Sequence, residues 1–225
     1  MLFLVLGKGK TGSLVAQVAR QRGHGVRALD ITENLHASAL TGPALAGVDA
    51  VIDFTAPEAA LENMRAVLAL GGRIVVGTTG WYSCLADMRA LAIKRGGGLL
   101  YGTNFSIGVQ KLFRLTDDLA KLEGYQFSIA ETHHTSKLDA PSGTAITLQE
   151  IILTRQPGAQ VQITSHRVGD ANGEHVVTAS GPDDVLELRH DAHSRRGFAL
   201  GAVRGAEWLA GKSGPHDFRE IFDQL

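Results

Sequence analysis

Residues 2–12 read LFLVLGKGKTG, and this stretch decides the fold of the first half of the chain. Its first five residues are all apolar, which is typical of a strand buried on both faces of a parallel sheet. The glycines that follow match G-x-G-x-x-G, directly after the strand and at the start of a predicted helix. Such a loop brings a pyrophosphate close to backbone N–H groups at the helix N-terminus. We therefore expect a dinucleotide to contact Gly7, Lys8, Gly9, Lys10, Thr11 and Gly12.

A carboxylate at the end of the next predicted strand supports this interpretation. Residues 26–30 form that strand, and Asp30 lies where a carboxylate can accept hydrogen bonds from both ribose hydroxyls. The alternative is an ordinary glycine-rich turn. The strand before the loop and the position of Asp30 both favour nucleotide binding over that alternative.

Strands and helices alternate through the first hundred residues. Further strands are predicted at 51–54, 73–77 and 99–101, with helices near 11–22, 57–70 and 83–95. This alternation predicts a parallel sheet with helices on both faces. Ligands of such sheets bind beyond the carboxyl ends of the strands. The loops after two of these strands are therefore further candidates for cofactor contacts: Gly77, Thr78 and Thr79, then Gly102, Thr103, Asn104 and Phe105.

After about residue 104 the pattern changes. A helix is predicted near 107–122, a strand over 125–132 and a second helix from Pro141 to about residue 153. Short alternating runs within 160–190 indicate a mostly antiparallel sheet with one open face.

The fold class is therefore α/β, with a Rossmann-type parallel sheet followed by an α+β domain. We expect a dinucleotide-binding domain at 1–103, an inserted domain at 104–199 and a helical segment at 200–225 that returns to the first domain.

Composition excludes several function classes. The 22 basic and 23 acidic residues give a formal net charge of -1, without the basic excess of a nucleic-acid or membrane-surface binder. The single cysteine, Cys84, excludes a disulfide framework and a multi-cysteine zinc site. No apolar run reaches the roughly 20 residues of a spanning helix. We therefore expect a cytoplasmic protein with neither nucleic acid nor membrane as a partner.

The most informative stretch is residues 131–145, ETHHTSKLDAPSGTA. His133 is of a residue type that can donate a proton near neutral pH. Lys137 offers a point charge for a carboxylate or a developing anion. Backbone N–H groups around Gly143 and Thr144, at a helix start, form a second place for an anion.

A metal site is the competing interpretation, because Glu131, His133 and His134 are all possible ligands. Adjacent histidines on a strand point to opposite faces, and the spacing does not match H-E-x-x-H. We therefore expect no metal.

The pattern E-x-H-H-x-x-K-x-D-A-P-S-G-T-A resembles the signature of the 4-hydroxy-tetrahydrodipicolinate reductase family. The resemblance covers nearly the whole chain and includes residues 7–12, 53–57, 77–80, 104–108, 173–175, 194–195 and 201–203. It implies an N-terminal Rossmann domain, a substrate-binding and tetramerisation domain and a C-terminal return. It also implies NAD(P)H-dependent reduction of a cyclic imine dicarboxylate in lysine and diaminopimelate biosynthesis, by a homotetramer.

By position, the resemblance makes His133 the general acid, Lys137 the catalytic lysine and His134 a substrate contact. Gly143 and Thr144 match the family's carboxylate-binding pair. The cofactor-binding positions match the loop residues named above and Asp30.

The chain departs from the family pattern in three places. It is shorter between residues 30 and 49, which affects the adenosine pocket, and within 154–190, which affects the oligomer sheet. Ile31 stands where many relatives carry an arginine that pairs with the 2′-phosphate of NADPH. Asp30 repels that phosphate, whereas Lys8 and Lys10 attract it, so we expect NADH preference or dual use.

Two other functions remain open. One is another small NAD(P)-dependent imine or amino-acid dehydrogenase with the same two-domain plan. The other is a nucleotide-sensing regulator without turnover, which the combination of His133, Lys137 and Thr144 disfavours, because sensing needs no proton donor opposite an anion site.

Overall fold

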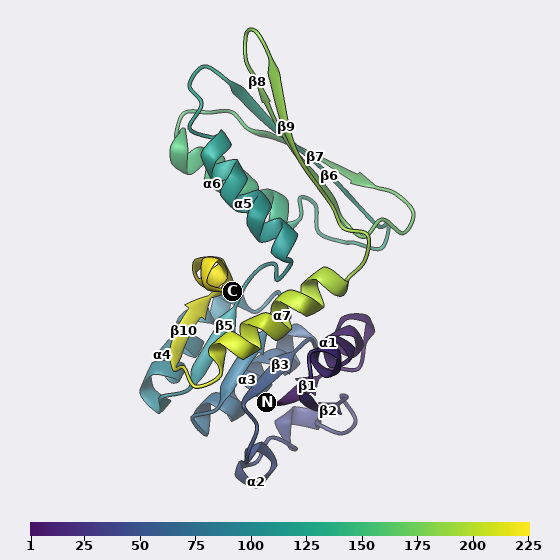
Figure 1. Cartoon of the computed structure of the whole chain (residues 1–225), viewed down its shortest axis with the longest axis vertical. Helices are drawn as coiled ribbons and strands as arrows, with labels where there is room; N and C mark the ends of the chain where they lie inside the picture. The colour runs from purple at the N-terminus through teal and green to yellow at the C-terminus, as the bar shows by residue number, and fades with distance from the viewer. The chain divides into compact units, whose positions relative to one another are not determined.

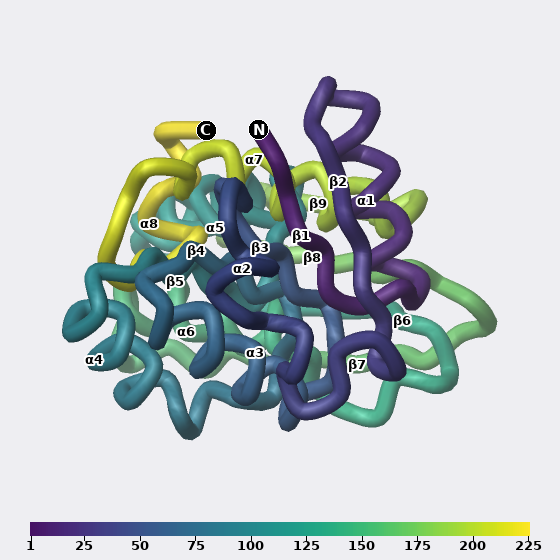
Figure 2. Tube along the Cα trace, turned by 90° about the horizontal axis from the view of Figure 1, so that it is seen from below, coloured from purple at the N-terminus to yellow at the C-terminus, as the bar shows by residue number.

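Six parallel strands form one sheet in the order β10-β5-β4-β3-β1-β2. The computed structural model of the chain describes all 225 residues, 1–225. The strands are β1 (Leu2–Leu6), β2 (Gly25–Leu29), β3 (Ala50–Asp53), β4 (Arg73–Val76), β5 (Gly98–Tyr101) and β10 (Gly214–Asp217). Strand β1 lies between β2 and β3, and it is bonded to both in parallel. Figure 2 shows β1 and β2 side by side.

Helices cover both faces of this sheet because successive apolar residues of each strand point to opposite sides. Phe3 and Val5 pack with helices α1 and α7, whereas Leu4 and Leu6 pack with α3 and α4. Figure 1 labels these four helices around the sheet. The helices are α1 (Lys10–Gln21), α2 (Gly42–Leu45), α3 (Pro57–Ala69), α4 (Leu85–Arg95), α7 (Arg196–Leu209) and α8 (Phe218–Ile221), with short 3-10 turns at Leu35–Ala37, Tyr82–Cys84 and Phe222–Gln224.

The chain divides into two compact units. The first contains Met1–Ser106 together with Arg196–Leu225, and the second contains Ile107–Arg195. Besides helix α7, the segment expected to be helical over 200–225 contains the strand β10, which is bonded in parallel to β5. This strand reads GPHD, so it has no apolar run or alternation by which the sequence could reveal it.

A four-stranded sheet in the order β7-β6-β8-β9 forms the second unit. Its elements are α5 (Ile107–Leu119), β6 (Gln126–His133), α6 (Gly143–Arg155), β7 (Gln162–Arg167), β8 (Glu174–Ser180) and β9 (Val185–Asp191). Strands β8 and β9 are antiparallel, as are β6 and β8. The predicted fold class, a Rossmann-type sheet plus a mostly antiparallel α+β domain, is confirmed.

One pair of this second sheet is parallel. Strand β6 leads through helix α6 into β7, and the two strands run in the same direction. Parallel neighbours require such a crossover, and α6 provides it. Helix α6 begins at Gly143 after the N-cap Ser142, rather than at Pro141 as expected.

Burial alternates along the strands of the second unit. Helices α5 and α6 lie on one side of the sheet (Figure 1). Phe127 and Ile129 belong to the core that these helices share with it, whereas Gln126 and Ser128 are exposed. The sheet therefore has the open face that the alternation predicts. None of the helices combines the length and apolar character that crossing a bilayer requires.

Candidate functional site

The loop after β1 needs glycine at two positions for steric reasons. Gly7 has φ +94°, and a Cβ on it would lie 2.3 Å from the backbone oxygen of Phe54. A Cβ on Gly12 would lie 1.9 Å from the oxygen of Gly7. Gly9 differs, because a Cβ there would meet nothing within 4 Å. The loop thus packs tightly against its own sheet and leaves open space at the start of α1, where a pyrophosphate would lie.

Asp30 follows β2 and is held by its own loop. Its Oδ1 accepts hydrogen bonds from the Thr32 backbone at 2.9 Å, the Thr32 hydroxyl at 2.7 Å and the Glu33 backbone at 3.1 Å. The hydrogen bond from the Thr32 hydroxyl, together with those from the backbone, lowers the pKa of the Asp30 carboxyl. An ionised carboxylate at this position suits the hydroxyls of a ribose.

Glu33 is a second carboxylate in this loop, and the sequence analysis did not single it out. Its Oε2 accepts hydrogen bonds from the Asp30 backbone at 2.8 Å and from Lys8 Nζ at 2.5 Å. Lys8 is therefore paired with Glu33 rather than extended toward solvent. Ile31, beside them, is 68% exposed.

The loops after β3 and β4 are joined by a buried carboxylate. Asp53 has no exposed surface, and its Oδ1 accepts from the Thr78 hydroxyl at 2.7 Å and from the Thr55 hydroxyl at 2.8 Å. Asn63 donates to its Oδ2 at 2.7 Å. The predicted cofactor residue Thr78 thus uses its hydroxyl inside the protein, whereas Thr79 is exposed at the same edge of the sheet.

The loop after β5 is mostly packed inward. The Phe105 side chain is 2% exposed and contacts Phe218 with ring centroids 4.4 Å apart. A Cβ on Gly102 would lie 2.9 Å from the Cβ of Phe218. Thr103 is exposed, whereas Asn104 is buried and accepts a hydrogen bond from the Ser106 backbone at 2.8 Å. At this loop only Thr103 is exposed, and the Phe105 ring belongs to the core.

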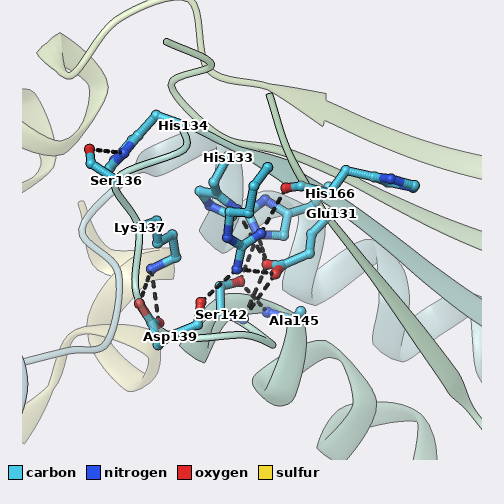
Figure 3. Close-up of polar contacts among 11 residues, drawn as sticks. Glu131, His133, His134, Ser136, Lys137, Asp139, Ser142, Ala145 and His166 are labelled. Atoms are coloured by element: carbon cyan, nitrogen blue, oxygen red, sulfur yellow. Dashed lines mark hydrogen bonds and ion pairs between the residues drawn. The ribbon is translucent and has the colours of Figure 1, made fainter. Parts of the chain in front are cut away.

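Around the end of β6, the second unit gathers a cluster of buried polar side chains (Figure 3). Glu131 and His133 lie two residues apart on one side of the strand, and they are 0% and 8% exposed. Glu131 accepts a hydrogen bond from the Ser142 backbone, with 3.2 Å to each oxygen. Arg167 Nη2, at the end of β7, donates to Glu131 Oε1 at 3.1 Å.

His175 from β8 completes this cluster. Its Nε2 shares a hydrogen bond with the Ser142 hydroxyl at 3.2 Å, and its ring centroid lies 5.1 Å from that of His133. The nearest approach of His133 Nδ1 to Glu131 Oε2 is 3.4 Å. Gly173, with φ +132°, lies against the other ring nitrogen, because a Cβ on it would be 3.1 Å from His133 Nε2.

Burial and hydrogen bonding set the charges of these groups. Burial raises the pKa of the Glu131 carboxyl, but hydrogen bonds from its neighbours outweigh that effect and lower it to about 2. Burial lowers the pKa of His133; Glu131 opposes this, and Lys137 and Arg167 add to it. Burial lowers the pKa of His175 to about 3. Both histidines are therefore neutral near pH 7, and Glu131 is ionised.

The loop that follows β6 carries the other predicted substrate residues. Lys137 Nζ contacts both carboxylate oxygens of Asp139, at 2.8 and 2.9 Å. His134 Nδ1 lies 2.8 Å from the Ser136 hydroxyl, and the His134 ring points away from His133 (Figure 3). The structure thus brings Lys137 near the His133 cluster but turns His134 outward.

The start of α6 is the place where the sequence predicts an anion site. Ser142 caps the helix, and its hydroxyl accepts a hydrogen bond from the Ala145 backbone at 3.2 Å. The N–H groups of the first turn have no acceptors within a helix, and they carry the positive end of its dipole. Gly143 is exposed, and a Cβ on it would meet nothing within 4 Å, so the approach to this turn is open. Thr144 is 7% exposed beside it.

The metal-ligand types that lie together differ from the set Glu131, His133 and His134 that the sequence analysis considered and set aside. Ligand atoms of Glu131, His133 and His175 lie within 4.8 Å of one another. However, the carboxylate already accepts from the Ser142 backbone and from Arg167, whose positive charge opposes a second cation. The donor environment of this cluster therefore favours an internal ion pair over a metal.

Comparisons with known proteins identify the family of the chain. The family model described as "Dihydrodipicolinate reductase, N-terminus" matches residues 2–105, and the model described as "Dihydrodipicolinate reductase, C-terminus" matches residues 108–223. The chain belongs to the dihydrodipicolinate reductase family. A relative from Christiangramia forsetii, named 4-hydroxy-tetrahydrodipicolinate reductase, is 34% identical over 100% of this chain and 99% of its own. A relative of the same name from Natronomonas pharaonis is 37% identical over 94% and 96%.

A solved structure shares the fold of this family member. The dipicolinate-bound dihydrodipicolinate reductase from a Paenisporosarcina species has a TM-score of 0.79 and 23% identity, over 100% of this chain and 99% of that one. The resemblance inferred from the sequence is thus confirmed. For a Rossmann-type member of this family, a pyridine nucleotide is the implied cofactor, and the glycine loop and Asp30 fit one.

The sequence analysis did not single out several residues of this candidate site. Arg167, His175 and Gly173 come from segments that carry no catalytic pattern of their own. The strand register brings two of them to the site. His133 of β6 lies opposite Arg167 of β7, and Glu131 of β6 lies opposite His175 of β8. Residues 173–175 belong to the resemblance, but they predict no role of their own.

Proposed function

We propose that this chain reduces 4-hydroxy-tetrahydrodipicolinate to tetrahydrodipicolinate with NADH or NADPH, in the diaminopimelate and lysine pathway. The observation that carries the proposal is His133 at the end of β6, buried beside Glu131 and close to the exposed start of α6. This combination offers a proton donor next to an anion site. It is the arrangement that an imine dicarboxylate requires. The names of the curated relatives support the same reaction.

The substrate is a dianion, and the second unit offers positive groups for its carboxylates. The N–H groups of Gly143 and Thr144 bind one carboxylate at the helix start, where Gly143 leaves open space. Lys137 binds the other by exchanging its contact with Asp139 for one with substrate. His134, which turns outward, approaches substrate through movement of its loop. The dipicolinate bound to the Paenisporosarcina relative is a ligand of this dianionic class.

His133 acts as the general acid. Water leaves the hydroxylated ring carbon, hydride adds to the conjugated system, and one proton is taken up. Because Nδ1 faces Glu131, the nitrogen left to donate is Nε2 beside Gly173. Burial keeps the pKa of His133 low in the free protein. The negative charge of a bound dicarboxylate favours the imidazolium from which the proton is donated.

The cofactor would bind at the carboxyl edge of the parallel sheet. The loop of Gly7, Gly9 and Gly12 would hold its pyrophosphate, and Asp30 would hold the adenosine ribose. When bound in its reduced form, the nicotinamide supplies the hydride.

We expect NADH preference or dual use. Asp30 and Glu33 place two carboxylates near the ribose, and Glu33 pairs with Lys8. Lys8 is thereby neutralised as a partner for a 2′-phosphate, and Ile31 offers no donor. Lys10 is exposed and remains the residue that could favour NADPH.

We further propose a cytoplasmic homotetramer that assembles through the open face of the β7-β6-β8-β9 sheet. Gln126 and Ser128 on β6 are exposed on that face, whereas their neighbours Phe127 and Ile129 are buried. The mass in solution tests this assembly.

The deciding experiment is NADH consumption on addition of the freshly made condensation product of pyruvate and aspartate semialdehyde. Turnover of this compound, with little or none of other cyclic or linear imines, supports the proposal. Turnover of another imine alone would make the chain a different dehydrogenase. Nucleotide binding without any turnover would make it a sensor.

A further inference from the structure

Glu131 lies in the interior of the second unit without an assigned part in the reaction. Its side chain is 0% exposed, and it precedes His133 by two residues on the same side of β6. An ionised carboxylate in such a place destabilises a fold unless donors surround it. Hydrogen bonds to Glu131 come from the start of α6 and from β7, so the carboxylate connects parts of the site that the chain does not connect locally.

One connection is to the start of helix α6. Both carboxylate oxygens of Glu131 lie 3.2 Å from the Ser142 nitrogen. Ser142 is the N-cap, so this contact sets the position of the turn that carries Gly143 and Thr144.

The second connection runs through Arg167. Its Nη2 donates to Glu131 Oε1 at 3.1 Å and to the backbone oxygen of Asp139 at 2.6 Å. Asp139 in turn contacts Lys137. Glu131 is therefore linked to the loop that carries the candidate substrate lysine.

The third connection is to the proton donor. Oε2 of Glu131 lies 3.4 Å from Nδ1 of His133, a buried atom that has no hydrogen-bond partner. A small rotation of the ring closes this distance to a hydrogen bond once Nδ1 carries a proton. The other groups facing His133 are Lys137 and Asp139 from the loop, Arg167 from β7 and the neutral His175 from β8.

We propose that Glu131 is a positioning residue, which holds the anion-binding turn of α6 in place and accepts from Nδ1 of His133 when that histidine becomes the imidazolium. The inference rests on the proposed function of His133 as general acid. Glu131 itself transfers no proton to substrate. It orients the ring so that Nε2 donates, and it stabilises the charged form against the nearby lysine and arginine.

The test is Glu131→Gln, a variant that keeps the size of the side chain and removes its charge. We expect the alkaline limb of the kcat/KM profile against pH to move down by about one unit or more, the usual effect of losing an adjacent opposite charge. We also expect KM for the imine to rise, because the Ser142 contact weakens. Asp117→Asn is the control, since it breaks a carboxylate–arginine pair with Arg155 that does not touch the site.

A second measurement separates this inference from the proposed function. Titration of His133 by NMR in the NADH-free protein should give a lower pKa in Glu131→Gln than in the wild type, whether or not the chain turns over the imine. A folded Glu131→Gln protein with an unshifted pH profile and an unshifted His133 titration would overturn the inference. If the wild type does not turn over the imine but the His133 titration still shifts in Glu131→Gln, the proposed reaction is rejected and the coupling between Glu131 and His133 is retained.

Glu131→Asp serves if the glutamine variant does not fold. This variant keeps the negative charge, but its side chain is shorter by one methylene, so the carboxylate lies farther from His133. We therefore expect the pH profile and the His133 titration to shift in the same direction as in Glu131→Gln, by a smaller amount. An aspartate variant whose His133 titrates as in the wild type would overturn the inference.

Discussion

Gly173→Ala tests whether the absence of a side chain at Gly173 is needed for the position of His133, the proposed proton donor. Gly173 has φ +132°, and a Cβ on it would lie 3.1 Å from Nε2 and 3.3 Å from Cδ2 of His133. Ordinary contacts between such atoms are about 3.5–4 Å. The methyl group therefore pushes the ring away by a few tenths of an ångström and occupies the side from which Nε2 would donate.

Two costs follow, and they appear in different measurements. A non-glycine residue held in this backbone region costs about 1–3 kcal/mol of stability. For a chain of this size, each kcal/mol lowers Tm by roughly 2–4 °C. A misplacement of about 1 Å at a catalytic group costs on the order of 10²-fold in rate, so a few tenths of an ångström should lower kcat by roughly fourfold to tenfold.

Gly169→Ala is the matched control. Gly169 also has a left-handed backbone, φ +46°, in the same connection between β7 and β8, but a Cβ on it would meet nothing within 4 Å. It should lose about 1–2 kcal/mol of stability and keep its kcat. Thermal melts and steady-state NADH consumption measure both variants. If Gly173→Ala melts early but turns over like Gly169→Ala, the reasoning about His133 is wrong.

Four further predictions concern the proposed sites. His133→Ala and Lys137→Ala should each lower kcat by at least about 10²-fold with NADH affinity kept, and wild-type turnover in both would reject their roles. Pyridine-2,6-dicarboxylate should compete with the imine and bind at least about tenfold better than pyridine-2-carboxylate, because it makes one more charge-assisted contact; equal inhibition constants contradict a dianion site. Glu33→Gln should raise the ratio of kcat/KM for NADPH over NADH by roughly twofold to fivefold by freeing Lys8, and Lys8→Ala in that background should remove the gain. Burial lowers the pKa of His175 to about 3, so as the pH falls below about 6.5 the unfolded chain takes up a proton before the folded protein does, and stability is lost. His175→Gln should therefore reduce the slope of the unfolding free energy against pH, between pH 6.5 and 5, by up to about 1.4 kcal/mol per pH unit. Urea titrations that give an unchanged slope would contradict this.

The sequence by itself determined the parallel sheet and the dinucleotide loop. Each of β1, β3, β4 and β5 contains a short apolar run that is ended by glycine or by a polar residue, so both signals lie within a few residues of each other. Gly7 and Gly12 are required because a Cβ on either would collide with a backbone oxygen. Their spacing directly after a buried strand, together with Asp30, predicts the loop. The stretch around His133, Lys137 and Gly143 was likewise visible, because its residue types are close together in the chain.

Only the tertiary structure decided what surrounds His133. Arg167 and His175 reach Glu131 because β7 and β8 pair with β6 in one register, and that register depends on a crossover through α6 and on a separate antiparallel ladder. The same holds for β10, whose four residues become a strand by pairing with β5. Hydrogen bonding between distant segments stabilises these elements, and the local sequence does not show which distant segment will pair with them.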